Sequence, residues 1–278
     1  MLSLILDNHS LARLIAFLVA ISLVGGWEIL APRRALTVSK ALRWANNWLI
    51  SAMNSVLLSA IFPVLGVGLA FIAAEKDWGL FNNLDLSPVV GIPLFVVLFD
   101  LAIYWQHRIF HMIPWLWRLH RMHHADPDFD VSSGIRFHPL SIILSMLIKM
   151  SVIVLIGPPP VAVLLAEIIL NVTAMFNHGN IFLPPRFDAV LRLFLVTPDM
   201  HRVHHSVKPE ECNSNFGFNF PWWDRLFGSY RPQPGDGHID MEIGIRGFQN
   251  IRTQMLDKLI LHPWLKQEIK GRSRGQTP

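Results

Sequence analysis

The chain has 278 residues, of which 52% are hydrophobic and only 16% are charged, and its mean hydropathy is +0.38. This composition is too apolar for an ordinary soluble domain of this length and favours a multispanning membrane protein. The formal net charge of +4 does not indicate a nucleic-acid partner, because the basic residues are dispersed beside apolar stretches. The single cysteine, Cys212, excludes an internal disulfide framework.

Several apolar stretches are candidates for membrane-spanning helices, since a helix of roughly 20 residues crosses a hydrocarbon core of about 30 Å. The stretches cover residues 11–30, 48–74, 88–105, 140–156 and 161–176. We expect Pro63 to kink the second stretch. The Gly-Pro-Pro-Pro sequence at 157–160 cannot continue a helix, so the last two stretches are predicted to form a helical hairpin. The first stretch lacks a clear cleavage site and is expected to be a retained anchor.

The charges between these stretches predict their orientation. The connection after the first stretch carries Arg33, Arg34, Lys40 and Arg43 without an acidic residue, and the positive-inside rule places such a loop in the cytoplasm. The third stretch then ends on the same side. We therefore predict an all-α, polytopic membrane protein of about four to five transmembrane helices, with a cytoplasmic, helical, histidine-rich metal domain and a cytoplasmic C-terminus.

Ten of the thirteen histidines fall between residues 107 and 205, and eight of these ten form three tight clusters. The clusters are one HxxxH pattern followed by two HxxHH patterns. Residues three and four apart share one face of a helix, so each cluster presents its imidazoles together. Neutral imidazole is the commonest metal ligand in proteins. The predicted ligands are His107 and His111, then His120, His123 and His124, and then His201, His204 and His205.

His178 is a ninth predicted ligand, because it shares a helix face with Glu167 and Asn171 at the end of an apolar stretch. A catalytic ion commonly takes three or four protein ligands, so eight or nine histidines imply two ions. Imidazole suits iron, copper, zinc and nickel alike, and the spacing alone leaves the metal open.

Three further residues are predicted to be catalytic. Asp100 and Tyr104 lie on one helix stripe with His107 and His111. A carboxylate inside an apolar span is usually functional. Asp100 either orients a ligand, lines the polar rim of a substrate pocket or is a structural hydrogen-bonding residue. Asp199 either caps the helix that carries the third cluster or accepts a hydrogen bond from a ligand imidazole.

The order HxxxH, HxxHH and HxxHH among apolar spans resembles the fatty acid hydroxylase/sterol desaturase superfamily of integral-membrane di-iron oxygenases. The likeness covers roughly residues 100–230 and includes Trp-Asp-Arg-Leu-Phe-Gly-Ser-Tyr at 223–230. The resemblance implies a non-haem centre of two iron ions (Fe2+/Fe3+) that uses O2 as co-substrate to hydroxylate or desaturate a C–H bond of a membrane lipid, of the sterol or fatty acyl type. It also implies an electron donor such as a b-type cytochrome, a ferredoxin or an NAD(P)H-dependent reductase.

The eight clustered histidines match the three motifs of this family, and His178 matches a histidine that the family often places ahead of the last motif. Some members have another histidine four residues earlier, where this chain has Ala174. The resemblance leaves His138 or a water molecule as alternatives for that ligand position. The aromatic-rich segment 216–228 is typical of interfacial anchoring or of packing against the metal domain.

The expected organisation is a membrane anchor region at 1–90, a catalytic region at 91–235 and a C-terminal cytoplasmic tail at 236–278, with a disordered basic end at 270–278. An alkylglycerol-monooxygenase-like ether-lipid enzyme stays open as an alternative. A membrane metal transporter or storage protein would distribute its histidines along a path across the membrane. A zinc hydrolase would need a carboxylate base, as in HExxH, and the sequence contains no such motif.

Overall fold

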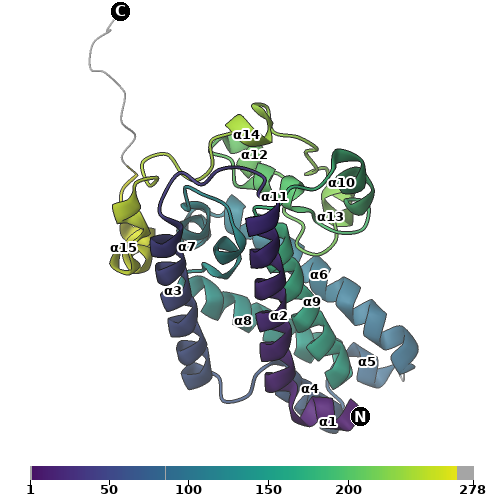
Figure 1. The fold of residues 1–278 in the computed structure, drawn as a ribbon. Helices are drawn as coiled ribbons and strands as arrows, with labels where there is room; N and C mark the ends of the chain where they lie inside the picture. Colours follow the sequence, from purple (N-terminus) through teal and green to yellow (C-terminus); the bar gives the residue numbers. More distant parts are fainter. Residues whose placement is uncertain (1, 85, 268–278) are drawn as a thin grey trace, which may run out of the picture.

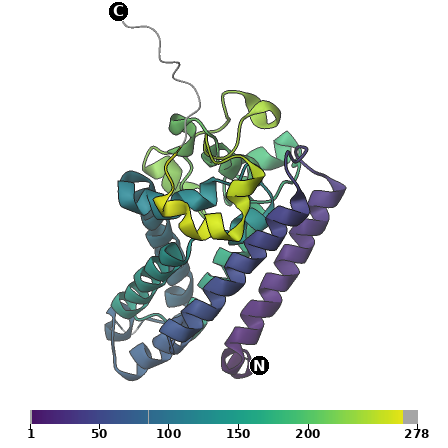
Figure 2. The ribbon, with the colours of Figure 1, turned by 90° about the vertical axis from the view of Figure 1, so that its left-hand side faces the viewer.

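The computed structural model describes residues 2–84 and 86–267, and the regular structure in these residues is helical (Figures 1 and 2). Five helical segments are long and apolar enough to cross a membrane, which confirms the predicted fold class. They are α2 (His9–Leu30), the region Lys40–Asn83 that holds α3 to α5, α6 (Pro88–Met112), α8 (Pro139–Ile156) and α9 (Pro160–Asn177).

The second apolar stretch differs from its prediction. The sequence predicts one kinked helix over 48–74, but α3 (Lys40–Ile61) and α4 (Gly66–Glu75) are separate helices. Ser39 starts α3 early, because its side chain accepts a hydrogen bond from a backbone N–H of the first turn. Pro63 lies between the two helices. Proline has no N–H to donate and disfavours helical geometry at the residue before it, so the helix ends there instead of bending.

The predicted hairpin of α8 and α9 is present. Gly157 ends α8 with φ at +65°, in the left-handed region that favours glycine. A Cβ at this position would lie 2.2 Å from the carbonyl oxygen of Trp78, so the close approach of this loop also requires glycine. Pro160 then occupies the first turn of α9, where a missing N–H costs nothing.

Helix α9 is the centre of the membrane-spanning part, since it packs against α2, α4 and α6. Its Val163 joins Phe95 and Phe99 of α6 in the main apolar core. Arg13 of α2 and Glu167 of α9 form an ion pair at 2.8 Å. Charged groups within a span are expensive unless they are paired, so this contact fixes α2 against α9.

The shorter helices gather at one end of the long ones, and the N-terminus lies at the opposite end (Figure 1). The elements at the first end are α7 (Pro114–His124), η1 (Val131–Ile135), α10 (Pro185–Leu191), α11 (Pro198–His204), α12 (Pro209–Cys212), α13 (Trp222–Leu226) and α14 (Gly237–Asp240). The remaining short helices are α1 (Leu2–Asp7), α5 (Leu80–Asn83), η2 (Ile251–Gln254), α15 (Leu256–Leu261) and η3 (His262–Trp264).

The described part of the expected C-terminal tail is folded onto the rest of the chain. α15 packs against α3, and η3 packs against α7. The guanidinium of Arg121 on α7 donates hydrogen bonds to the carbonyls of His262 and Leu265 at 2.8 and 2.6 Å, which holds this segment beside the histidine helix. The basic end predicted at 270–278 lies outside the described residues.

Arg43 of α3 joins a membrane-spanning helix to the loop that follows α7. Its side chain is fully buried, and it donates to Asp126 at 2.6 Å and to Asp130 at 2.7 Å. Both carboxylates are themselves buried. Removing one partner of a buried ion pair leaves an uncompensated charge, so this contact is a strong constraint on the loop.

We predict that Arg43→Met lowers the free energy of unfolding by about 3 kcal/mol or more, because two buried carboxylates lose their cation. The measurement is thermal or denaturant unfolding of the purified protein in detergent. The control is Arg252→Met, since Arg252 pairs with Asp257 but is 66% exposed; its expected change is below about 0.5 kcal/mol. Equal stability of the two variants would contradict the assigned role of Arg43.

Candidate metal centre

The described residues bring nine histidines together in two groups. Within each group one nitrogen of every ring lies within 4.8 Å of the others. The first group contains His107, His111, His120, His124 and His204, and the second contains His123, His178, His201 and His205. These are the nine residues that the sequence predicts as ligands, and each HxxHH motif contributes to both groups.

Four helices place these rings. The last turns of α6 carry His107 and His111, α7 carries the second cluster, and α11 carries the third, which ends at its C-cap residue His205. His178 is the C-cap residue of α9. Because neighbouring residues of α7 and α11 point to different sides of each helix, His123 and His124 enter different groups, as do His204 and His205.

Backbone carbonyls orient four of the rings through their Nδ1 atoms. Nδ1 of His107 lies 2.9 Å from the carbonyl oxygen of Phe216, and Nδ1 of His204 lies 2.7 Å from that of Ser214. In the second group, Nδ1 of His178 lies 2.7 Å from the carbonyl oxygen of Ala174. The ring of His123 makes the same contact with the carbonyl of Arg136 at 3.2 Å. A carbonyl oxygen can only accept, so Nδ1 carries the proton in these rings and Nε2 has a free lone pair.

The free Nε2 atoms face one another. Nε2 of His204 lies 3.0 Å from Nε2 of His107, and Nε2 of His123 lies 3.1 Å from Nε2 of His178. With Nδ1 protonated, no proton remains to bridge either pair in the neutral rings. Two ligands at about 2.1 Å from one ion lie about 3.0 Å apart at a right angle and about 3.4 Å apart in a tetrahedron. The observed spacing therefore fits a shared cation, and Nε2 of His205 has no hydrogen-bond partner that would compete with one.

Burial keeps these rings neutral. It lowers the pKa of His178 to about 4 and holds the pKa of His120, His124 and His204 well below the ordinary value, with the neighbouring imidazoles adding to the effect. A metal ion requires the unprotonated ring, so the site is prepared for a cation at neutral pH.

Comparison with known proteins agrees with this geometry. The model of the fatty acid hydroxylase family matches residues 92–229. Ornithine lipid hydroxylase OlsE of Rhizobium tropici is 30% identical over 156 residues, which are 56% of this chain and 46% of that protein. The human alkylglycerol monooxygenase is 25% identical over 242 residues, covering 85% of this chain and 51% of the relative. Human lathosterol oxidase is 29% identical over 157 residues, covering 56% and 48%.

The chain belongs to the fatty acid hydroxylase/sterol desaturase superfamily. It spans about half the length of each of these three relatives. No solved structure gave a significant match to the chain.

Asp100 is one of the three residues predicted to be catalytic. It contacts backbone N–H groups and an indole, and it contacts no ring of the two histidine groups. Its carboxylate accepts hydrogen bonds from the backbone N–H groups of Asn219 and Phe220 at 3.1 and 3.2 Å, and from the indole of Trp223 at 2.8 Å. These contacts fix the segment that contains Phe216, whose carbonyl orients His107. Of the three alternatives for Asp100, the contacts favour the structural one.

Tyr104 and Asp199 also lie outside the two histidine groups. The Tyr104 hydroxyl is 2.9 Å from the Ser229 hydroxyl and accepts a hydrogen bond from Arg108 at 2.9 Å. Asp199 accepts from Arg33 at 3.1 Å and pairs with Arg202. A catalytic role for these residues stays a prediction. The alternative that Asp199 caps α11 is wrong, because the side chain of Thr197 accepts the capping bond and Asp199 lies in the first turn.

His138 is an alternative for the ligand that some family members supply at the position of Ala174. It belongs to neither histidine group. Its Nδ1 accepts a hydrogen bond from the backbone N–H of Leu140 at the start of α8, and its Nε2 lies 3.0 Å from the carbonyl oxygen of Ile260. Both ring nitrogens of His138 therefore make contacts within the fold, and neither is available to a metal ion. Ala174 does not supply a side-chain ligand, but its carbonyl orients His178.

The aromatic segment after the third cluster packs directly on the two histidine groups. The ring of Phe216 lies 5.7 Å from His107 and 5.5 Å from His204, and that of Phe218 lies 6.3 Å from His107. Asp224 fixes this segment by accepting from the N–H groups of Phe216 and Gly217, both at 2.8 Å. The sequence indicates packing or anchoring for this segment, but no signal in it identifies the carbonyls that orient the rings.

We predict that His178→Ala lowers the metal content of the purified protein to about half, because the second group keeps only three rings and loses a central one. The measurement is elemental analysis with the metal-to-protein ratio. His138→Ala is the control, since it removes a buried imidazole that caps α8 and should leave the ratio unchanged. An equal loss in both variants would mean that metal content follows general stability and not ligation.

Proposed function

We propose that this protein is a membrane-bound, non-haem di-iron oxidoreductase that uses O2 to hydroxylate or desaturate a C–H bond of a lipid of the sterol or fatty acyl type. The observation that carries the proposal is the pair of adjacent imidazole groups with unprotonated Nε2 atoms at 3.0 and 3.1 Å from one another. Membership of a superfamily of lipid hydroxylases and oxidases supports it.

The residues that would hold the two ions are the five rings of the first group and the four of the second. When bound, a di-iron centre supplies the strong oxidant that an unactivated C–H bond requires. Within the chain, the carbonyls of Phe216, Ser214, Arg136 and Ala174 keep the rings in the tautomer that leaves Nε2 free. The aromatic rings of Phe216 and Phe218 pack against His107 and would limit the access of water to it.

Asp100, Tyr104 and Asp199, predicted as catalytic, enter this proposal as positioning residues. Asp100 holds the segment that carries Phe216, and Tyr104 holds Ser229 near the same segment. Asp199 pairs with Arg202 between two ligand histidines of α11. Each of them acts on a ring through an intervening group, so substitutions should alter metal affinity before they alter product identity.

The five apolar segments support a multi-pass membrane protein whose substrate reaches the histidines from the bilayer. We further propose that the histidine end faces the cytoplasm, because the α2–α3 connection with Arg33, Arg34 and Lys40 lies at that end (Figure 1). An electron donor such as a b-type cytochrome, a ferredoxin or an NAD(P)H-dependent reductase would act there. The proposed organisation keeps an anchor region at 1–90, a catalytic region at 91–235 and a cytoplasmic C-terminal region at 236–278.

An ether-lipid monooxygenase is the second candidate. The similarity to human alkylglycerol monooxygenase extends over 85% of this chain and so includes most of the membrane helices, whereas the match to the ornithine lipid hydroxylase covers 56%. A metal transporter is a weaker candidate, because the nine histidines gather at one end of the long helices and do not follow a path along them.

The test is mass spectrometry of lipids from cells with and without the protein, at normal and low O2. We predict an O2-dependent product that is 16 mass units heavier for hydroxylation or two units lighter for desaturation, and we predict that His120→Ala and His204→Ala abolish it. Deuterated ether lipid and deuterated fatty acid, supplied separately, distinguish the two substrate classes.

The matched control is His262→Ala, since His262 is a buried histidine outside both groups whose ring nitrogens make no hydrogen bond. It should retain product formation and membrane insertion. Full zinc occupancy without an O2-dependent product would overturn the oxygenase proposal.

A further inference from the structure

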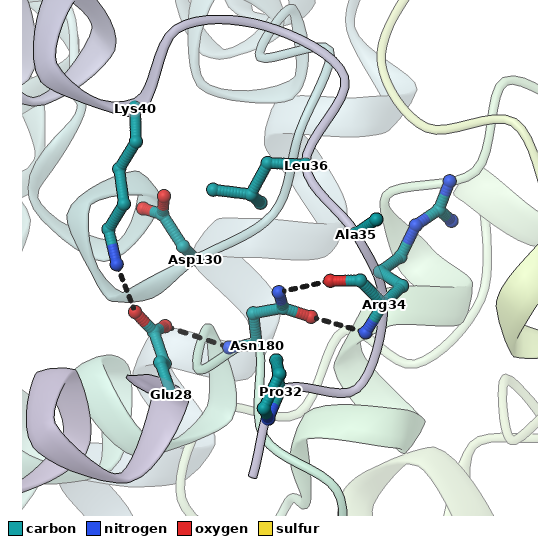
Figure 3. Close-up of a pocket in the computed structure, with 8 residues that line it drawn as sticks. All are labelled: Glu28, Pro32, Arg34, Ala35, Leu36, Lys40, Asp130 and Asn180. Carbon is teal, nitrogen blue, oxygen red and sulfur yellow. Dashed lines mark hydrogen bonds and ion pairs between the residues drawn. The ribbon is translucent and has the colours of Figure 1, made fainter. Parts of the chain in front are cut away.

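A polar pocket opens between the C-terminal end of α2 and the start of α3, apart from the histidine groups (Figure 3). Its volume is about 370 Å³. The residues that line it are Glu28, Pro32, Arg34, Ala35, Leu36, Lys40, Asp130 and Asn180. It therefore combines two basic and two acidic side chains with a short apolar wall.

Glu28 has one carboxylate oxygen that lacks a hydrogen bond. The residue is 4% exposed, and its Oε1 accepts from the backbone N–H groups of Val131 at 2.6 Å and Asn180 at 2.8 Å. Its Oε2 has no hydrogen-bond partner, and the Lys40 ammonium lies 3.5 Å away. A charge-assisted hydrogen bond is about 2.7–2.9 Å long, so this contact is loose. A hydrogen-bond donor that entered through the pocket would stabilise this buried carboxylate, because it would satisfy the oxygen that lacks a hydrogen bond.

The other acidic side chain is not free to bind. The carboxylate of Asp130 accepts from Arg43 at 2.7 Å, from the Trp44 indole at 3.2 Å and from the Ser132 hydroxyl at 2.6 Å. A divalent cation would therefore find only one free carboxylate oxygen, on Glu28, which is too few for a dedicated site. A single ammonium group suits one carboxylate oxygen better.

One basic group, Lys40, lies beside this acceptor, whereas the Arg34 guanidinium points away from it (Figure 3). Lys40 points into the pocket in Figure 3 and is 38% exposed, so its long side chain can move without disturbing the core. Arg34 uses one nitrogen to donate to the carbonyl of Met241 at 2.8 Å. An anionic group close to Lys40 would also approach the N-terminus of α3, where free N–H groups and the helix dipole favour negative charge.

The pocket lies where two candidate membrane spans end, and lipid headgroups are expected at the ends of spans. Glu28 is in the last turn of one candidate span and Lys40 in the first turn of another. Beside the opening, Ile29 is 75% exposed and Leu30 is 86% exposed, as expected for side chains that face lipid. A headgroup in the pocket can thus continue into acyl chains along the outside of α2.

We propose that this pocket binds the headgroup of an aminophospholipid, with its ammonium on Glu28 and its phosphate on Lys40 and the start of α3. The Glu28 oxygen without a hydrogen bond takes a donor that an anionic headgroup lacks, and Lys40 takes the phosphate, so the two side chains together fit a zwitterion. The site is separate from the oxidation chemistry. Since Glu28 also holds Asn180, two residues after the ligand His178, an occupied pocket braces the second histidine group.

The experiment measures lipid affinity of the full-length protein in detergent by native mass spectrometry. Phosphatidylethanolamine and phosphatidylglycerol with identical acyl chains are the two probes, and glycerophosphoethanolamine is the soluble competitor. We expect phosphatidylethanolamine to bind about tenfold more tightly than phosphatidylglycerol. Glu28→Gln should reduce this preference to about twofold or less, because an amide keeps the contact with Val131 and Asn180 but loses the charge.

Lys40→Met should weaken the binding of both lipids by about fivefold and leave the preference for phosphatidylethanolamine unchanged. The matched controls are Glu75→Gln and Lys76→Met, which alter exposed charges at the end of α4 and should change neither affinity nor preference. Thermal unfolding identifies any variant that fails to fold, and Glu28→Asp or Lys40→Gln then replaces that variant as a test of the same contact.

Equal affinity for the two lipids, or an unchanged preference in Glu28→Gln, would overturn the assignment of an ammonium to Glu28. Binding of glycerophosphoethanolamine as tight as that of the lipid would overturn the assignment to a membrane lipid. None of these outcomes depends on an oxidised product, so failure of this proposal is distinguishable from failure of the proposed oxygenase activity.

Discussion

Imidazole lone pairs that face one another without a proton between them are the constraint on which this structure depends. Carbonyl acceptors fix the proton of His107, His204, His123 and His178 on Nδ1, and their Nε2 atoms meet at 3.0 and 3.1 Å. Burial prevents protonation from relieving this contact. A cation would stabilise such an arrangement, and its binding would then be coupled to folding of this end of the protein.

The surroundings of the histidines show how the chain keeps that arrangement rigid. After α7 the loop carries three aspartates, and all three are tied to the α2–α3 connection or to α3. Asp126 and Asp130 bind Arg43, and Asp128 accepts from the backbone N–H of Thr37 at 2.8 Å and from its hydroxyl at 2.9 Å. The connection between two membrane helices and the loop after the second histidine cluster consequently form one polar network. Movement of α2 or α3 in the bilayer would be transmitted to the rings through it.

The sequence was informative where a local pattern decides structure. Apolar length predicted the spans, Gly-Pro-Pro-Pro predicted the hairpin, and i, i+3 and i+4 spacing predicted that the imidazoles of each cluster lie together. It was less informative where a distant partner decides. The sequence left three roles open for Asp100, because its partners Asn219 and Trp223 lie more than a hundred positions away in the chain. The partner of His138 is also distant in the chain. It is the carbonyl of Ile260, which lies in the segment that the sequence predicts to be a C-terminal tail.

Some of the site could not be read from residue types at all. The groups that orient the rings are backbone carbonyls, which every residue has, so neither Phe216 nor Ser214 carries a signature for this role. The HxxHH motif also does not indicate which of its three imidazole rings belongs to which histidine group. That assignment depends on the relative rotation of α7 and α11, which tertiary packing fixes.

The aromatic segment after the third histidine cluster connects the apolar core of the membrane-spanning helices with the histidine groups. Asp100 anchors it from within the apolar span α6, and Asn177 at the end of α9 donates to the carbonyl of Phe218 at 3.0 Å. The Phe218 ring packs against the main apolar core on one side and lies 6.3 and 6.4 Å from His107 and His201 on the other. Apolar packing therefore continues from the membrane-spanning helices to the imidazoles without an intervening polar layer at this point. A hydrocarbon chain meets no desolvation barrier along such a surface, whereas water does. In the proposed reaction this difference would favour oxidation of lipid over reaction with solvent.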